Sequence, residues 1–270
     1  MKTVLITGAE GTIGSVLRRT LAGSYALRSL TRTAVANLES TAVDIANLDA
    51  ILPAFEDADA VVHLVASATV DAAWPDVLHN NIEGLYNVFE ASRRAGVRQV
   101  VFASSNHAVG GYEADGSPSI YRRRSGVMVG VDAPLRPDSL YGVSKAFGEA
   151  MGRYYVETFG LKVYCLRIGS VLADDDPRAA AIREGPGPFW LPPMTAEERL
   201  RRYAATWLSH ADLARLVDAC LRAEHIDFGI YYGVSDNPYR FWTLDNAHAD
   251  LGFWPHDAAD SSGLEPPGDG

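Results

Sequence analysis

The chain has 270 residues, 47% of them hydrophobic and 21% charged, and 34 acidic residues outnumber 24 basic ones to give a formal net charge of −10. These values are typical of a globular protein with its own core, and they exclude a nucleic-acid binder that depends on a basic surface. No apolar run reaches the ~20 residues that span a bilayer, and the 2 cysteines favour neither a disulfide framework nor a metal site. We therefore expect a cytoplasmic protein without nucleic-acid, membrane or metal partners.

Strand and helix patterns alternate along most of the chain. Residues 2–7 (KTVLIT) form an apolar run typical of a parallel strand buried on both faces, and no run of signal-peptide length follows Lys2. The next predicted elements are a helix at 12–21, a strand at 25–31, a helix at 48–55, a strand at 58–66, a helix at 74–95, a strand at 99–105, a helix at 140–159, a strand at 162–168, a helix at 213–221 and a strand at 228–232. This alternation predicts an α/β fold with a doubly wound parallel sheet of the Rossmann type.

Two long segments, 110–137 and 173–193, break the alternation and are rich in glycine, proline or charged residues. Both follow predicted strand ends, where such sheets bind ligands, so we expect irregular functional loops. We assign 1–170 and 205–235 to a dinucleotide-binding domain, and 171–204 and 236–270 to a small C-terminal substrate lobe and tail. The tail after Pro255 is expected to be disordered.

The first strand runs into a glycine-rich turn, TGAEGTIG. Gly8, Gly11 and Gly14 would make the tight turn, let backbone amides approach a pyrophosphate, and let the helix pack on the strand. Thr12 and Ile13 open the helix whose N-terminus would face the phosphates. No Lys-Ser/Thr pair follows the last glycine, which excludes a mononucleotide P-loop.

The second strand lacks the carboxylate that reads the ribose of NAD. It ends instead in Thr31 and Arg32. Arg32 could pair with a 2′-phosphate, so NAD is the expected cofactor with NADP also possible. Asp44 and Ile45 follow a short third strand and are placed to meet the adenine, and Leu64 and Ile168 at later strand ends complete the expected cofactor site.

A serine, a tyrosine and a lysine form the candidate catalytic group. Tyr141 and Lys145 share one face of a helix because they are four residues apart. A nearby ammonium would lower the pKa of the phenol, which is ordinarily ~10. Ser105, at the end of a strand, could hydrogen-bond a substrate oxygen. These groups suit removal of a proton from an alcohol while hydride leaves its carbon.

Five motifs together resemble the extended short-chain dehydrogenase/reductases: TGAEGTIG, VVHLVA, NNIEGLYNVFEA, VFASSN and YGVSK. FASSNHAVGGY at 102–112, RPDSLYGVSKAFGE at 136–149, RIGS at 167–170 and TWLSHADL at 206–213 are similar to uronate dehydrogenases, as is DNAH at 245–248. The resemblance implies an NAD-dependent enzyme that oxidises glucuronate or galacturonate at the anomeric carbon to an aldarolactone. The chain departs from that family at Thr31-Arg32, in a longer loop at 172–199 and beyond Trp254.

The resemblance also implies a set of sugar-binding residues. Arg202 would hold the substrate carboxylate with its planar guanidinium, and either Ser67 or Thr69 would supply a further contact. Asn81 would be a structural asparagine. The other residues expected around the sugar are Ser105, Asn106, His107, Tyr141 and Ser170.

Three other functions remain open on the residues alone. An aldose or sugar-phosphate dehydrogenase would use the same catalytic group, with Arg202 or the 122–124 arginines binding a phosphate. A nucleotide-sugar epimerase or dehydratase is disfavoured, since Asn106-His107 stands where dehydratases carry Asp-Glu and the lobe is small. A dinucleotide-sensing regulator would typically lose the tyrosine and lysine. We expect a homo-oligomer, a dimer paired through the helices 74–95 and 140–159.

Overall fold

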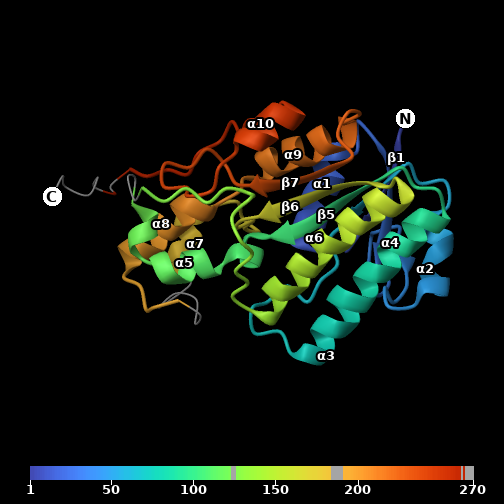
Figure 1. Cartoon of the computed structure of the whole chain (residues 1–270), viewed down its shortest axis with the longest axis horizontal. Helices are drawn as coiled ribbons and strands as arrows, with labels where there is room; N and C mark the ends of the chain where they lie inside the picture. The colour runs from blue at the N-terminus through green and yellow to red at the C-terminus, as the bar shows by residue number, and fades with distance from the viewer. Residues whose placement is uncertain (123–125, 184–190, 263, 265–270) are drawn as a thin grey trace.

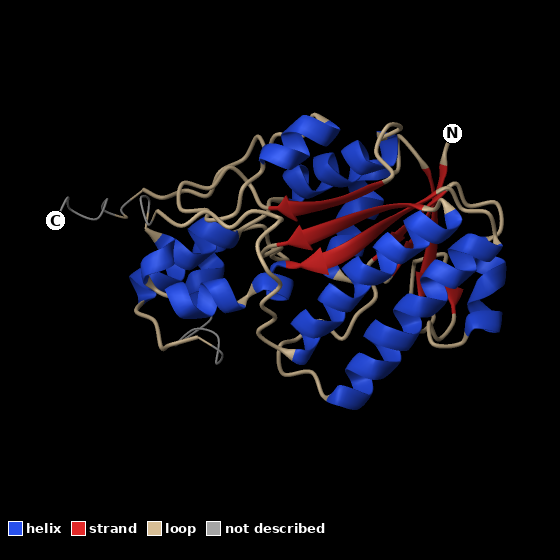
Figure 2. Ribbon diagram, viewed as in Figure 1, coloured by secondary structure: helices blue, strands red, loops and turns tan. Residues whose placement is uncertain are grey.

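The structure is a computed structural model, and it describes residues 1–122, 126–183, 191–262 and 264. Among these residues a single parallel sheet of 7 strands lies at the centre of the molecule, in the order β3-β2-β1-β4-β5-β6-β7 (Figure 1, Figure 2). The strands are β1 (Thr3–Thr7), β2 (Ala26–Thr31), β3 (Thr41–Ala42), β4 (Ala60–His63), β5 (Gln99–Ser105), β6 (Lys162–Ile168) and β7 (Phe228–Gly233). The strand order reverses between β1 and β4, which is where doubly wound sheets bind ligands.

Helices cover both faces of the sheet because alternate strand residues point to opposite sides. Val4 and Ile6 of β1 pack with α1 (Thr12–Leu21) and α9 (His210–Arg222). Leu5 packs on the other face with α2 (Leu48–Phe55), α4 (Gly84–Arg94) and α6 (Leu140–Phe159). The predicted fold class is therefore confirmed.

Several predicted elements match the structure to the residue: helices 12–21, 48–55 and 140–159, and strands 99–105 and 162–168. The strand predicted at 58–66 is wrong at both ends, since β4 covers only Ala60–His63. The helix predicted at 74–95 is three consecutive helical segments: α3 (Trp74–Asp76), a π-helical turn η1 (Val77–Glu83) and α4. The π segment is only 7 residues long and runs directly into α4, so the apolar pattern of the whole stretch still predicts a single helix.

A small lobe lies beyond the carboxyl ends of β5, β6 and β7 (Figure 1). It contains α5 (Gly111–Gly116), α7 (Pro177–Arg183) and α8 (Ala196–Thr206), and a separate apolar cluster that includes Tyr121, Ala204 and Trp242 forms its core. The segments predicted to be irregular therefore contain α5 and α7. These helices are too short to show a periodic apolar pattern.

The domain division proposed from the sequence remains a proposal, and two elements bear on it. α5 lies in the lobe, together with the 3-10 helix η3 (Ser119–Tyr121), although both fall within 1–170. α10 (Asp245–Leu251) falls within 236–270 but packs its Ala247 into the core cluster shared with α1 and α9.

The expectation that the tail after Pro255 is disordered is wrong for the described residues up to 264. Asp257 accepts a hydrogen bond from Ser209 Oγ at 2.5 Å, and the Ala259 N–H donates to Asn237 Oδ1 at 3.1 Å. Ala259 and Leu264 are buried in the lobe core. The polar composition of the tail gives no sign of these few anchoring contacts. Residues 263 and 265–270 lie outside the described part of the chain.

Candidate active site

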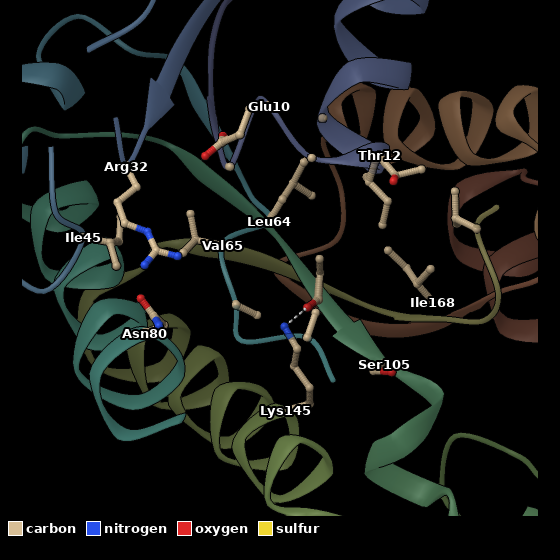
Figure 3. Close-up of a pocket in the computed structure, with 18 of the residues that line it drawn as sticks. Glu10, Thr12, Arg32, Ile45, Leu64, Val65, Asn80, Ser105, Lys145 and Ile168 are labelled. Carbon is tan, nitrogen blue, oxygen red and sulfur yellow. Dashed lines mark hydrogen bonds between the residues drawn. The ribbon is translucent and has the colours of Figure 1, made fainter. Parts of the chain in front are cut away.

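A cavity of about 460 Å³ opens at the carboxyl edge of the sheet, where the strand order reverses. Figure 3 shows its walls, which come from the turn after β1, the ends of β2, β4, β5 and β6, and α6. The predicted cofactor residues on this cavity are Gly8, Gly11, Thr12, Ile13, Gly14, Arg32, Asp44, Ile45, Leu64, Tyr141, Lys145 and Ile168. Thr31 does not line it, because its buried hydroxyl is 2.8 Å from Ser40 Oγ.

The glycine-rich turn has the shape that a pyrophosphate requires. Gly8 has φ +68°, and a Cβ on Gly14 would lie 2.5 Å from the Gly8 carbonyl oxygen. Gly11 caps α1 without a side-chain hydrogen bond, and the first turn of α1 contains no acidic residue. The first N–H groups of α1 thus keep their donors for a bound anion. The turn fits a dinucleotide.

The adenosine side of the cavity carries opposite charges at two strand ends. Figure 3 shows the Arg32 guanidinium directed into the cavity near Ile45, Val65 and Asn80. Asp44 is 3.0 Å from His79 Nε2. The Ala46 backbone N–H, aided by His79 and Arg32, lowers the pKa of Asp44 below its usual value. The described residues contain no acid at the end of β2.

Ser105, Tyr141 and Lys145 come together on one wall of the cavity. Ser105 ends β5, and Tyr141 and Lys145 lie one turn apart on α6. Lys145 Nζ donates to the Ala103 carbonyl at 2.7 Å and lies 5.3 Å from the centre of the Tyr141 ring. All three side chains are buried, so the group is rigidly held.

The pKa shifts in this wall follow burial. Burial raises the pKa of Tyr141 to about 12, with a hydrogen bond from Ser105 opposing the rise and the charge of Asp138 adding to it. Burial also lowers the pKa of Lys145 to about 7. The expected lowering of the Tyr141 pKa is therefore wrong for this structure. Desolvation of the phenolate is the largest cause of the rise, and Lys145 is itself only partly charged near neutral pH.

Asn106 and His107 begin the 3-10 helix η2 (Asn106–Val109) directly after Ser105. His107 Nδ1 is 2.7 Å from Asp138 Oδ2, and its ring meets the Tyr141 ring edge to face at 5.7 Å. Ser105 Oγ donates to Asn106 Oδ1 at 3.2 Å. A Cβ on Gly142 would lie 2.3 Å from the His107 carbonyl oxygen, so a glycine lets α6 approach this turn. His107 thus packs against Tyr141, and Asn106 holds Ser105.

Like Asn106 and His107, the other predicted sugar contacts do not line the cavity. Ser170 is bonded to Thr206, with 2.9 Å between their hydroxyl oxygens. Ser67 accepts a hydrogen bond from Asn80 at 3.0 Å, and Thr69 is exposed in the same loop. None of the three lines the cavity. Asn81 joins this loop to α6: it accepts from the Ser67 N–H at 2.7 Å and donates to Ser144 Oγ at 2.9 Å.

Arg202, the expected carboxylate ligand, is buried in the lobe and forms an ion pair. Its Nε donates to Glu113 Oε1 at 2.9 Å, and Tyr121 Oη donates to the same oxygen at 2.8 Å. Arg202 does not line the cavity. The arginines 123 and 124, expected as alternative phosphate ligands, lie outside the described residues, as does 184–190 of the loop 172–199.

Several residues of the cavity and one of the lobe were not predicted from the sequence. Asn80 and Ser104 line the cavity, and each is next to a residue that the motifs had marked. Nothing in the sequence pointed to Glu113, since it lies 89 positions from Arg202 in a segment expected to be irregular.

In the described part of the chain, no group of 3 or more His, Cys, Asp or Glu side chains could hold a metal ion. No described helix has the length and apolar content to cross a membrane.

The sequence matches a family model described as the NAD dependent epimerase/dehydratase family over residues 4–182. It is 38% identical to L-arabinose 1-dehydrogenase (NAD(P)(+)) of Haloferax volcanii over 263 residues, 95% of this chain and 97% of that protein. It is 35% identical to the NAD-dependent glucose-6-phosphate dehydrogenase of the same organism over 265 residues, 94% of this chain and 93% of the relative.

A solved structure shares the fold over the whole chain. A mutant uronate dehydrogenase from Agrobacterium tumefaciens complexed with NAD superimposes with a TM-score of 0.78 at 31% identity, covering 100% of this chain and 92% of the other. The similar proteins thus include dehydrogenases named for three kinds of sugar: a pentose, a hexose phosphate and a uronate.

Proposed function

Because the chain belongs to the NAD dependent epimerase/dehydratase family, we propose that it oxidises the anomeric carbon of a free sugar to a lactone. The observation that carries this proposal is the group of Ser105, Tyr141 and Lys145 on the wall of a cavity that begins at a dinucleotide-binding turn. Its cofactor is NAD. The chain is an oxidoreductase that acts on a CH–OH group of a sugar, as are the dehydrogenases to which it is similar.

The reaction removes a proton and a hydride from the sugar, and each has its own acceptor. NAD held at the glycine-rich turn would supply the acceptor for the hydride of the sugar carbon. Tyr141, in its phenolate form, takes the proton of the anomeric hydroxyl, and Ser105 holds the same oxygen as charge develops on it. Lys145 favours the phenolate when protonated. The turn at Gly8–Gly14 and the end of β2 would bind the dinucleotide, and His107 packs against the Tyr141 ring.

A uronate is the first candidate substrate. The chain has the residues that the resemblance to uronate dehydrogenases implies: Asn106 and His107 after Ser105, Ser170 after β6, and Arg202 ahead of Trp207. A solved relative of that name covers the whole chain. An arginine is well suited to a carboxylate because its two N–H groups match the two oxygens.

An uncharged aldose is the second candidate, and one structural observation favours it. Arg202 is paired with Glu113 inside the lobe, so the positive charge that would attract a uronate is already balanced. The relatives named for arabinose and for glucose 6-phosphate widen the choice further.

The proposal is tested by mixing the purified protein with NAD and a panel of uronates, aldoses and sugar phosphates and recording NADH absorbance. We expect turnover of at least one free sugar and a lactone as the first product. NAD binding without oxidation of any sugar in the panel would instead support the dinucleotide-sensing regulator, and turnover only of nucleotide-linked sugars would support an epimerase-like enzyme.

A further inference from the structure

One buried ion pair bears directly on the substrate class. The Arg202 side chain is 7% exposed and the Glu113 side chain 1%, and Arg202 Nε lies 2.9 Å from Glu113 Oε1. Water screens neither charge at such burial, so each depends on the other for stabilisation. The Tyr121 hydroxyl donates to the same carboxylate oxygen at 2.8 Å and holds it in place.

The pair joins elements that continue directly from the active-site strands. Glu113 lies on α5, which follows Ser105 and η2 along the chain. Arg202 lies on α8, which begins in a capping box formed by Thr195 and Glu198. The end of α8 is tied to the chain just after β6, because the Ser170 N–H donates to the Thr206 carbonyl at 2.7 Å. The pair therefore lies in the lobe that covers the carboxyl ends of β5 and β6.

If the substrate meets Arg202, as the resemblance to uronate dehydrogenases implies, a substrate carboxylate would compete with Glu113 for its guanidinium. If it displaced Glu113, that carboxylate would stay buried without its cation; if it joined the pair, two anions would share one cation. Glu113 Oε2 is also buried without a hydrogen-bond partner among the described residues. A hydroxyl can donate to such an oxygen, whereas an ionised carboxylate cannot.

We propose that Glu113 balances the charge of Arg202 and so selects uncharged aldoses over uronates and sugar phosphates. This assignment rests on the proposed oxidation of a free sugar, and it makes Glu113 a specificity-determining residue of that reaction. Glu113 acts through Arg202, and it takes no part in the transfer of the proton or the hydride.

The first experiment uses the unaltered protein with NAD and compares arabinose, glucose, glucuronate and glucose 6-phosphate. We expect kcat/KM for an uncharged aldose to exceed that for either anion by about tenfold or more, a difference that one unbalanced charge readily produces. An anionic sugar as the preferred substrate would overturn the role of Glu113 and leave the proposed oxidation standing. If no sugar is oxidised, binding of arabinose and glucuronate to the NAD-loaded protein, measured by calorimetry, still tests the selection.

The second experiment uses Glu113→Gln, which keeps the side-chain shape and removes the charge. We expect its KM for glucuronate to fall about tenfold with little change in the KM for arabinose. The double variant Glu113→Gln/Arg202→Gln should lose that gain, because the cation is gone. Tyr121→Phe is the matched control: it removes one hydrogen bond to Glu113 without changing charge and should leave the ratio unaltered. Equal changes in KM for both sugars would contradict the proposal; if Glu113→Gln does not fold, the preference of the unaltered protein decides.

Discussion

Burial shifts the pKa values of Tyr141 and Lys145 in opposite directions, and both shifts favour the uncharged form of the side chain. The pKa of Tyr141 rises to about 12, while that of Lys145 falls to about 7, in each case mainly through desolvation. The neutral forms of both side chains are favoured because they are buried in the cavity wall. A positive charge brought close to the phenol would reverse part of the Tyr141 shift, since an opposite charge favours the phenolate.

Removal of the phenol oxygen tests the role of Tyr141. Tyr141→Phe should lower kcat by about 10²–10⁴-fold, the usual contribution of a positioned acid or base. NAD binding, measured by fluorescence titration, should change little. Tyr154→Phe is the control, because Tyr154 lies on the same helix but is exposed. Activity retained in Tyr141→Phe would remove this residue as the base.

Arg32 allows a test of cofactor choice that needs no sugar. If its guanidinium binds the 2′-phosphate, Arg32→Ala should raise the Kd for NADP roughly tenfold or more, the equivalent of one charge-assisted hydrogen bond. The Kd for NAD should stay nearly constant. Arg28→Ala is the control, because Arg28 lies on β2, the strand that leads into Arg32, but outside the cavity. An equal rise in the Kd for NAD and for NADP would show that Arg32 does not recognise the 2′-phosphate selectively.

At the scale of elements, α6 is fastened to the sheet at successive turns. Lys145 donates to the Ala103 carbonyl of β5, and one turn later Glu149 accepts two hydrogen bonds from Arg167 of β6, each at 2.9 Å. Ser104 Oγ also donates to Glu149, at 2.7 Å. The helix that carries the tyrosine and lysine is thus held against the strand that carries Ser105.

Loss of the buried Glu149 charge should destabilise this packing. Glu149→Gln leaves Arg167 buried without its anion, and we expect the free energy of unfolding to fall by about 3–5 kcal/mol. Urea denaturation followed by fluorescence measures the change. Glu157→Gln removes the exposed partner of Arg153 on the same helix and should cost no more than about 1 kcal/mol. Similar losses in both variants would mean that the buried pair has no special role.

At the scale of the whole molecule, stability depends on a histidine in the middle of the sheet. His63 ends β4, is buried, and lies 2.8 Å through Nδ1 from the Thr7 hydroxyl. Burial, aided by the charge of Lys145, lowers its pKa to about 3. The unfolded chain binds this proton at an ordinary pKa of ~6.5. The stability associated with neutral His63 is therefore complete above that value and is lost as pH falls toward 3.

This linkage predicts a pH profile for unfolding. The urea midpoint should decrease below pH ~6.5, and His63→Gln should decrease less steeply because it has no proton to bind. The control is His225→Gln, an exposed histidine that should keep the slope of the unaltered protein. An unchanged slope in His63→Gln would show that other groups account for the loss of stability in acid.

The outer faces of the two long helices bear on assembly. Tyr86 of α4 and Val143, Tyr154 and Phe159 of α6 are exposed apolar residues on helices that pack side by side. We propose that these faces pair in a homodimer. Sedimentation should give twice the 29.2 kDa chain mass, and Val143→Glu should shift the protein toward the monomer. A monomer at all concentrations would refute this assembly.

The order of the strands and helices was readable in the sequence because local patterns encode it. A buried parallel strand is a continuous apolar run, an amphipathic helix repeats every 3.6 residues, and three glycines with one tyrosine and one lysine mark the site. The residues that line the cavity at the ends of β1, β2, β4 and β6 followed from those patterns, since parallel strands end at one edge.

Only the tertiary structure brought together groups that local patterns do not connect. Arg202 pairs with Glu113, and Glu149 pairs with Arg167, across long stretches of chain. The burial that shifts the pKa values of Tyr141, Lys145 and His63 also comes from packing in three dimensions. Charge balance and desolvation depend on what surrounds a group in space. The sequence therefore indicated a sugar dehydrogenase, while the packing of the lobe bears on which sugar it accepts.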